Sequence, residues 1–252
     1  MTFPPLTIVH RDACLLVVDK PPGEPSVPGR DPSLPRSTFE RALDLEPAAR
    51  VVHRLDMATS GLLVFALDSA TQRSLGIAFQ DREVEKEYVA VVEGELPLGK
   101  GEWASIDLPI GFDWEDRPRR RIGGPGAKPA LTHWRVASAA ASDSAGPHTP
   151  GCAVVGASAS ARTLIELRPH TGRTHQLRVH MAALGHPIVG DAMYGEALAE
   201  GQWAGPHAAR LMLHARHMTF RHPSTGVSMT FASDEYFRCI SSTTGGSPPV
   251  PP

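Results

Sequence analysis

A short polar segment set between two apolar runs, residues 53–61, constrains this chain more than any other feature. Two valines at 51–52 lead into the segment, and a strand-like apolar run over residues 62–67 follows it. The segment ends in threonine, serine and glycine, which favour turns. Asp56 is therefore expected on a loop held between two buried segments, where catalytic side chains are often presented. The spacing alone, however, favours a simpler interpretation in which Asp56 caps the turn and pairs with Arg54.

We expect a single α+β domain over residues 1–240, built on a mixed, largely antiparallel sheet with flanking helices. Short apolar runs bounded by turn residues supply the strands. The expected strands cover residues 6–9, 14–18, 62–67, 88–92, 131–136, 163–167, 211–220 and 227–231, and residues 103–110 also alternate like a strand. Residues 137–161, rich in alanine, serine and glycine, are expected to form a flexible surface excursion, and residues 241–252 a disordered tail.

Three helices are expected from their capping signals. Capping-box patterns begin at Ser37 and at Ser69, and the second opens a helix that runs to about residue 81. Thr174 is expected to cap a third helix, which Gly185 ends. The expected buried face of this third helix comprises Leu177, Met181 and Leu184.

The overall charge of the chain does not indicate a nucleic-acid partner. The 252 residues carry a formal net charge of −2, so any such attraction must come from local patches. The three cysteines, Cys14, Cys152 and Cys239, are odd in number and widely spaced, which favours reduced thiols and a cytoplasmic location. No signal-peptide pattern opens the chain and no apolar run approaches membrane-spanning length, so no membrane partner is expected.

The most basic stretch of the chain follows residue 116. Five cationic residues, with no acid among them, share this stretch with three glycines; they are Arg117, Arg119, Arg120, Arg121 and Lys128. Clustered arginines beside flexible glycines suit a nucleic-acid backbone, but a solvated surface loop fits the pattern equally well. Arg30, in a loop rich in turn formers, is a further candidate for phosphate contact, with a plain surface loop as the alternative.

Three blocks, in the right order, resemble the RluA family of RNA pseudouridine synthases. They are His53-Arg54-Leu55-Asp56 followed by Thr59-Ser60-Gly61, then Lys86-Glu87-Tyr88-Val89-Ala90, and then the run from Arg168 to His180. The resemblance extends to about residue 231, and the stretches around 26–30 and 106–118 are most similar to the RluA subgroup itself. It implies a pseudouridine synthase catalytic domain with an RNA cleft across one face of its sheet. Members of that subgroup act on a hairpin loop of large-subunit rRNA and on the tRNA anticodon stem-loop, so one or both are expected as substrates.

The resemblance also implies roles within the site. Asp56 would be the essential nucleophile or base, and Arg178 its charged partner. Tyr88 would stack on the extracted uracil or take the proton from its C5, and Arg54 would fill the space that the base leaves. From the residues alone, Arg178 could be an exposed helix arginine and Tyr88 a tyrosine buried in the sheet. The expected RNA contacts are Arg30, Arg54, Arg119, Arg120, Arg121 and Arg173.

Two other interpretations compete with a pseudouridine synthase. A zinc enzyme would have to use His170, His175 and His180, but a spacing of five separates neighbours by about 140° on a helix and puts them on opposite faces of a strand. A non-catalytic RNA-binding module would keep the arginines without needing Asp56. Because the isomerisation has no redox step, no cofactor is expected; we also expect no metal, and a monomer.

Overall fold

The computed structural model describes residues 5–96, 101–137, 162–195 and 210–233. Nearly all of the expected 137–161 excursion, the whole of the expected 241–252 tail and the end of the expected 1–240 domain lie outside these residues. No helix among the described residues combines the length and the apolar character that crossing a membrane requires.

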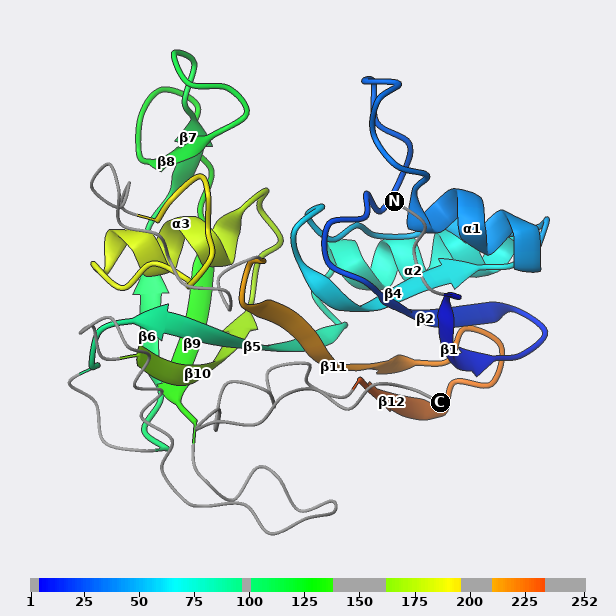
Figure 1. Cartoon of the computed structure of the whole chain (residues 1–252). Helices are drawn as coiled ribbons and strands as arrows, with labels where there is room; N and C mark the ends of the chain where they lie inside the picture. Colours follow the sequence, from blue (N-terminus) through cyan, green and yellow to red (C-terminus); the bar gives the residue numbers. More distant parts are fainter. Residues whose placement is uncertain (1–4, 97–100, 138–161, 196–209, 234–252) are drawn as a thin grey trace, which may run out of the picture.

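One ten-stranded sheet organises the described part of the chain (Figure 1). Its strands follow the order β1-β2-β4-β11-β5-β10-β9-β6, with β3 paired to β4 and β12 paired to β11. All pairings in this sheet are antiparallel except that β11 runs parallel to β4. The strands are β1 (Thr7–Arg11), β2 (Leu15–Lys20), β3 (Arg50–Val51), β4 (Ser60–Ala66), β5 (Glu85–Glu93), β6 (Ala104–Asp107), β9 (Leu131–Val136), β10 (Arg162–Pro169), β11 (Leu213–Arg221) and β12 (Ser228–Ala232). The expected α+β fold is confirmed, and each expected strand is present.

A separate hairpin, β7 (Ile110–Phe112) and β8 (Arg120–Ile122), extends from the main sheet beside α3 (Gln176–Ala183) (Figure 1). Phe112 pairs with Arg120 in its register. Ile110 and Val179, the latter on α3, pack in the same small apolar cluster. The basic segment is therefore not simply a loop, because part of it forms a strand that is held against α3.

The first two helices are capped by polar side chains. In α1 (Thr38–Leu45) the expected capping box is present, with Ser37 and Glu40 each accepting the other's backbone N–H. The helix α2 (Ser69–Gln80) is capped one residue earlier than expected. Asp68 is its N-cap, because its carboxylate accepts the backbone N–H of Thr71 at 2.8 Å.

The start of α3 was predicted wrongly. His175, not Thr174, is the N-cap residue; it adopts a left-handed conformation with φ 58°, and no side chain caps the helix. Leu177 and Met181 are buried as expected, but Leu184 is 39% exposed. Leu184 lies at the C-cap, where the chain leaves the helix, so the helical periodicity no longer places it on the buried face.

The two faces of the β2–β4 pair are covered by different helices. Leu15, Val17, Leu62 and Val64 pack with Leu75 of α2, whereas Leu16, Val18, Leu63 and Phe65 pack with Ala42 of α1. Alternate residues of a strand face opposite sides, so these continuous apolar runs are buried on both. Full burial of one such side chain contributes about 1.5–3 kcal/mol. This pair of strands is therefore the firm support on which the neighbouring loop rests.

The loop that carries Asp56 is anchored at both of its ends. Val51 at the end of β3 pairs with Phe65 of β4, and the chain re-enters the sheet at Ser60. The loop thus leaves one strand and returns as the strand beside it. This is the arrangement that the apolar runs on either side of the segment predicted.

Candidate active site

Asp56 and Arg178 lie together, as the resemblance implied. Arg178 Nη1 is 3.5 Å from Asp56 Oδ2. The Asp56 side chain is 24% exposed, whereas that of Arg178 is 5% exposed. The pair presents a carboxylate that meets a buried cation on one side and is open to a ligand on the other.

Arg178 is itself held by Asp191, a residue that the sequence analysis missed. Arg178 Nε and Nη2 each donate a hydrogen bond of 2.7 Å to the Asp191 carboxylate, which is fully buried. That carboxylate also accepts the backbone N–H groups of Met193 and Tyr194. Burial acts to lower the pKa of Arg178, but its bonds to Asp191 and the charge of Asp56 raise the pKa overall. Two-point pairing fixes the orientation of the guanidinium as well as its position.

Tyr194 links Arg178 to the β7–β8 hairpin. Its ring lies over the guanidinium, with 5.1 Å between Arg178 Cζ and the ring centroid. Its hydroxyl oxygen accepts the backbone N–H of Arg120 at 2.8 Å and lies 2.7 Å from His175 Nδ1. The arginine beside the carboxylate is therefore connected, through one tyrosine, to the hairpin that carries the basic segment.

Lys20 is a second cation near Asp56 that the sequence analysis missed. It is fully buried, and its Nζ donates to the carbonyl oxygens of Pro21, Glu24 and Met57 at 2.9, 2.7 and 3.0 Å. Burial lowers the pKa of Lys20 to about 7, against the opposing charges of Glu24, Asp56 and Asp19. Because Met57 directly follows Asp56, the bond from Lys20 Nζ to Met57 O helps to hold the Asp56 loop in place.

The segment after Lys20 is bonded to the same loop. Gly23 N–H donates to Met57 O at 2.9 Å. Ser26 Oγ donates to Leu55 O at 2.8 Å and accepts Leu55 N–H at 3.0 Å. The backbone atoms of Leu55 and Met57, on either side of Asp56, are thus held by hydrogen bonds. These bonds restrict the position of the Asp56 carboxylate.

The charge of Asp56 affects the pKa of Tyr88. Its side chain, on β5, is partly buried and packs against two of the core clusters. Burial, and then the negative charge of Asp56, raise the pKa of Tyr88 well above its ordinary value. At neutral pH Tyr88 is therefore an uncharged phenol, which offers a ring face and an O–H donor.

His53 serves the structure of the loop. Its Nε2 accepts the backbone N–H of Val64 at 3.1 Å, and its ring stacks on Phe79 with 4.6 Å between centroids. Burial, and then the charge of Lys86, lower the pKa of His53 to about 3. It is a neutral ring that joins the start of the loop to β4 and α2.

The arginines expected to contact RNA differ in their exposure and in their contacts with the rest of the protein. Arg30, Arg54 and Arg121 are exposed. Arg119 forms an ion pair of 2.8 Å with Asp116, so the basic segment is less unbalanced than its sequence indicated. Arg173 is partly exposed and donates from Nε to Pro129 O at 3.1 Å.

The β7–β8 hairpin also carries exposed aromatic rings that the sequence analysis missed. Arg120 Cζ lies 3.7 Å from the centroid of Phe112, and Arg117 Cζ lies 4.3 Å from that of Trp114. The two rings stack, with centroids 5.1 Å apart, and are 47% and 58% exposed. Aromatic rings and guanidinium planes are the surfaces on which unstacked RNA bases stack. The hairpin is therefore a candidate RNA contact for a reason beyond its charge.

The three histidines of the zinc interpretation are engaged separately. His180 lies 2.9 Å from Thr132 Oγ1 and 3.0 Å from Leu108 O, His175 bonds Tyr194, and His170 accepts from Arg82. These partners hold the rings in different surroundings. Their arrangement does not support the zinc interpretation.

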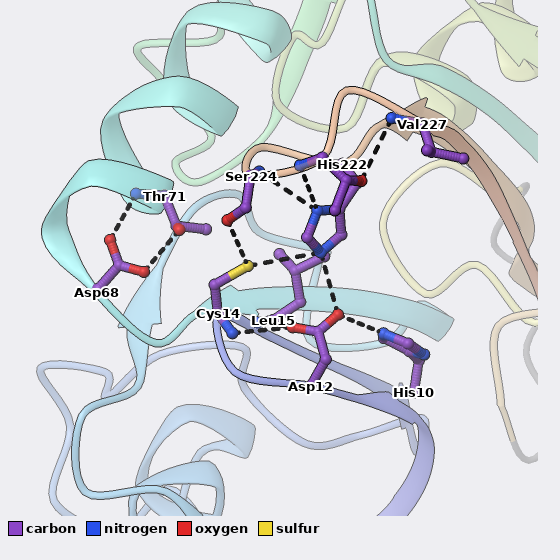
Figure 2. A network of polar contacts seen from close by, with 10 residues as sticks. His10, Asp12, Cys14, Leu15, Asp68, Thr71, His222, Ser224 and Val227 are labelled. Atoms are coloured by element: carbon purple, nitrogen blue, oxygen red, sulfur yellow. Dashed lines mark hydrogen bonds and ion pairs between the residues drawn. The ribbon is translucent and has the colours of Figure 1, made fainter.

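Within the described residues, one group of metal-ligating side chains lies elsewhere, where Asp12, Cys14 and His222 join the β1–β2 turn to the end of β11 (Figure 2). His222 Nδ1 faces the backbone N–H groups of Ser224 and Thr225 at 3.3 and 3.2 Å. A neutral ring therefore carries its proton on Nε2, which faces Asp12 Oδ2 at 3.1 Å and Cys14 Sγ at 3.5 Å. A protonated ring nitrogen donates a hydrogen bond and does not ligate a metal. This group is a hydrogen-bonded clamp between two turns.

The fold and the carboxylate–arginine pair define the class of protein. A family model described as RNA pseudouridylate synthase matches residues 14–183, a span that contains Asp56, Tyr88 and Arg178. The chain belongs to this family, and it is an RNA pseudouridine synthase, an isomerase that modifies RNA.

The relatives of this chain cover nearly its whole length. It is 41% identical over 234 residues to the "Dual-specificity RNA pseudouridine synthase RluA" of Escherichia coli, covering 93% of this chain and 95% of the relative. The protein of the same name from Haemophilus influenzae is 40% identical over 234 residues, with the same coverage. Among solved structures, "Human RNA Pseudouridylate Synthase Domain Containing 1" matches with a TM-score of 0.70 and 30% identity, over 91% of this chain and 83% of that one. The resemblance to the RluA family and the expected fold are both confirmed.

Proposed function

We propose that this synthase isomerises uridines in a hairpin loop of large-subunit rRNA, in the tRNA anticodon stem-loop, or in both, with Asp56 as its catalytic carboxylate. Relatives named dual-specificity synthases support action on more than one RNA. The proposal includes a cytoplasmic enzyme that works as a monomer.

The observation that carries the catalytic assignment is the 3.5 Å approach of Arg178 Nη1 to Asp56 Oδ2. Isomerisation breaks the N-glycosidic bond, turns the uracil and forms a carbon–carbon bond. A carboxylate can attack the uracil ring, attack C1′ of the sugar, or remove a sugar proton, and each route uses its anionic form. A guanidinium fixed beside a carboxylate stabilises that form. Arg178 is fixed in this way, because Asp191 holds two of its nitrogens.

Tyr88 and Arg54 fit the handling of the base. A stacked uridine must be extracted from its helix, at a cost of a few kcal/mol. Arg54 is exposed two residues before Asp56, and a planar guanidinium can stack and donate hydrogen bonds in the vacated space. The uncharged Tyr88 offers a ring face for the extracted uracil.

Tritium release from RNA labelled at uracil C5 tests the proposal. The wild-type chain should release tritium from an rRNA hairpin or an anticodon stem-loop, and Asp56→Asn should release none while its circular dichroism stays unchanged. Arg73→Gln, at an exposed position of α2, is the matched surface control. Full activity of Asp56→Asn would refute the catalytic role of Asp56. Pseudouridine maps of rRNA and tRNA from a strain lacking the protein would identify the substrate.

A further inference from the structure

A cavity between the start of β5 and the end of β10 contains cations that the proposed catalytic roles do not use. Its volume is about 410 Å³, and its lining includes Arg82, Lys86, Glu87, Arg168, His170 and His217. Leu167 is the last residue of β10 that pairs with β5, opposite Tyr88. Beyond this pair the cavity opens between the two segments, one bearing the tyrosine and the other leading into the Arg178 helix.

Lys86 lies on β5, two residues before Tyr88. Alternation along a strand places it on the face of Tyr88, with Glu85 and Glu87 on the other face. Its charge contributes to the lowered pKa of His53, at the start of the Asp56 loop. No carboxylate among the described residues lies within ion-pair distance of Lys86. Burial, and then the positive charge of Arg82, lower the pKa of Lys86.

Arg82 is the second cation of the cavity, and it contacts His170, which supplies a third hydrogen-bond donor. Its Nη1 lies 3.1 Å from His170 Nε2. Because a guanidinium can only donate, Nε2 is the acceptor, and the neutral His170 ring carries its proton on Nδ1. Three side chains from two segments therefore bring two positive charges and a free N–H donor to one cavity.

Two carboxylates, Glu85 and Glu87, also line the cavity, and they do not cancel its positive charge. Glu87 accepts hydrogen bonds of 3.0 and 2.8 Å from Arg168 Nε and Nη2, and its other oxygen lies 3.0 Å from His217 Nδ1. It is satisfied on the opposite face of β5. Glu85 offsets one of the two remaining cations, Arg82 and Lys86, so the cavity keeps an excess positive charge for a ligand.

We propose that Arg82, Lys86 and His170 bind one phosphate of the RNA backbone, in a nucleotide that flanks the extracted uridine. The inference rests on the proposed function, because it places an RNA strand across the Asp56 loop. Phosphate contacts set the position of a nucleic acid without reading its sequence. A phosphate clamp of this kind would hold the target strand in the same way in two RNAs of different sequence.

Binding of a fluorescent anticodon stem-loop RNA, measured by anisotropy over a range of salt concentrations, tests this site. Removing one phosphate contact should weaken binding by about tenfold and reduce the slope of log Kd against log salt by about 0.7–0.9. We expect this of Lys86→Met, with Lys86→Arg restoring the slope. Arg73→Met is the matched control and should bind as the wild type does. Arg82 is exposed, so Arg82→Gln gives the same test if Lys86→Met fails to fold.

A neutral methylphosphonate, placed at one backbone position at a time, locates the contact. At one position beside the target uridine, the methylphosphonate should weaken RNA binding by the wild type. The same substitution should not weaken binding by Lys86→Met any further. An unchanged salt slope in both Lys86→Met and Arg82→Gln, or equal methylphosphonate effects in wild type and variant at every position, would overturn the site. If the wild type releases no tritium from any RNA, the proposed function fails instead, so the two failures are distinguishable.

Discussion

Arg178 donates two hydrogen bonds of 2.7 Å to the buried carboxylate of Asp191, while its third nitrogen faces Asp56 at 3.5 Å. The arginine is thus shared between two carboxylates of different exposure, 0% for Asp191 and 24% for Asp56. The buried carboxylate anchors the guanidinium, and the accessible one is available to a substrate. Loss of either carboxylate should therefore affect the enzyme differently.

Replacing Asp191 with asparagine should slow turnover without weakening RNA binding. The amide keeps one acceptor but loses the charge and the two-point geometry that orient Arg178. A misplacement of the order of 1 Å at a reacting group costs up to about 100-fold in rate, so we expect Asp191→Asn to lose about 10- to 100-fold in the single-turnover rate. Asp81→Asn, at an exposed position, is the control. If Asp191→Asn had the wild-type rate, Arg178 would not depend on Asp191 for its position.

Replacing Lys20 with methionine should impair both the fold and the catalytic loop. Three carbonyl oxygens would lose the Lys20 donor, and of these Met57 O would keep the Gly23 N–H. An unsatisfied buried polar group costs about 1–3 kcal/mol. We expect Lys20→Met to lower the free energy of unfolding in urea by at least about 2 kcal/mol. The single-turnover rate should fall as well, because Met57 O is one of the three acceptors. The RNA Kd should stay near that of the wild type, since Lys20 is buried. A variant that lost stability but kept the full rate would show that Lys20 does not position Asp56.

The sequence analysis identified those parts of the site whose signal is local. Apolar runs and turn residues placed the Asp56 loop between two buried segments, and the family blocks supplied Tyr88 and Arg178. Asp191 and Lys20 had no such signal. Lys20 lies beyond the expected strand 14–18 and before two prolines. Its bond to Met57 O exists only because β2 pairs with β4.

The misplaced helix starts have a related cause. A serine or threonine followed by a helical pattern fits a cap, but the backbone conformation of the flanking residues decides which side chain reaches the first N–H groups. Asp68 reaches them in α2. At α3, the left-handed His175 takes the cap position, and its ring bonds Tyr194 instead. That contact joins segments separated in sequence, so local pattern did not reveal it.

Removing the charges of Arg119, Arg120 and Arg121 should weaken RNA binding and flatten its salt dependence. Each lost phosphate contact reduces the salt slope by about 0.7–0.9, so replacement of all three by glutamine should reduce it by about 2.1–2.7. The hairpin should remain folded, because Arg120 contacts Tyr194 through its backbone N–H. The matched control replaces the exposed Arg36, Arg73 and Arg221, which changes the net charge equally. An equal loss of slope in both triple variants would mean that overall charge, not the hairpin, attracts the RNA.

The clamp at Asp12 should contribute to stability at neutral pH and lose that contribution in acid. Burial acts to raise the pKa of Asp12, but hydrogen bonds from His10, from the backbone of Cys14 and Leu15, and from His222 together hold it well below its ordinary value. A carboxyl group whose pKa is lower in the folded than in the unfolded chain stabilises the fold above its unfolded pKa of about 3.9. That stabilisation is lost as the pH falls from there through the folded pKa.

The variant Asp12→Asn tests whether the contribution of Asp12 to stability is lost as the pH falls. Charge-assisted hydrogen bonds contribute about 1.5–3 kcal/mol, so the variant should unfold in urea with a free energy about 2 kcal/mol lower than wild type at pH 7. The difference should narrow progressively below about pH 4, where the wild-type carboxyl group gains its proton in the unfolded chain. Asp31→Asn, at an exposed position, controls for the loss of one negative charge. A difference between Asp12→Asn and wild type that stayed constant down to about pH 3 would show that the ionised carboxylate is not what holds the two turns together.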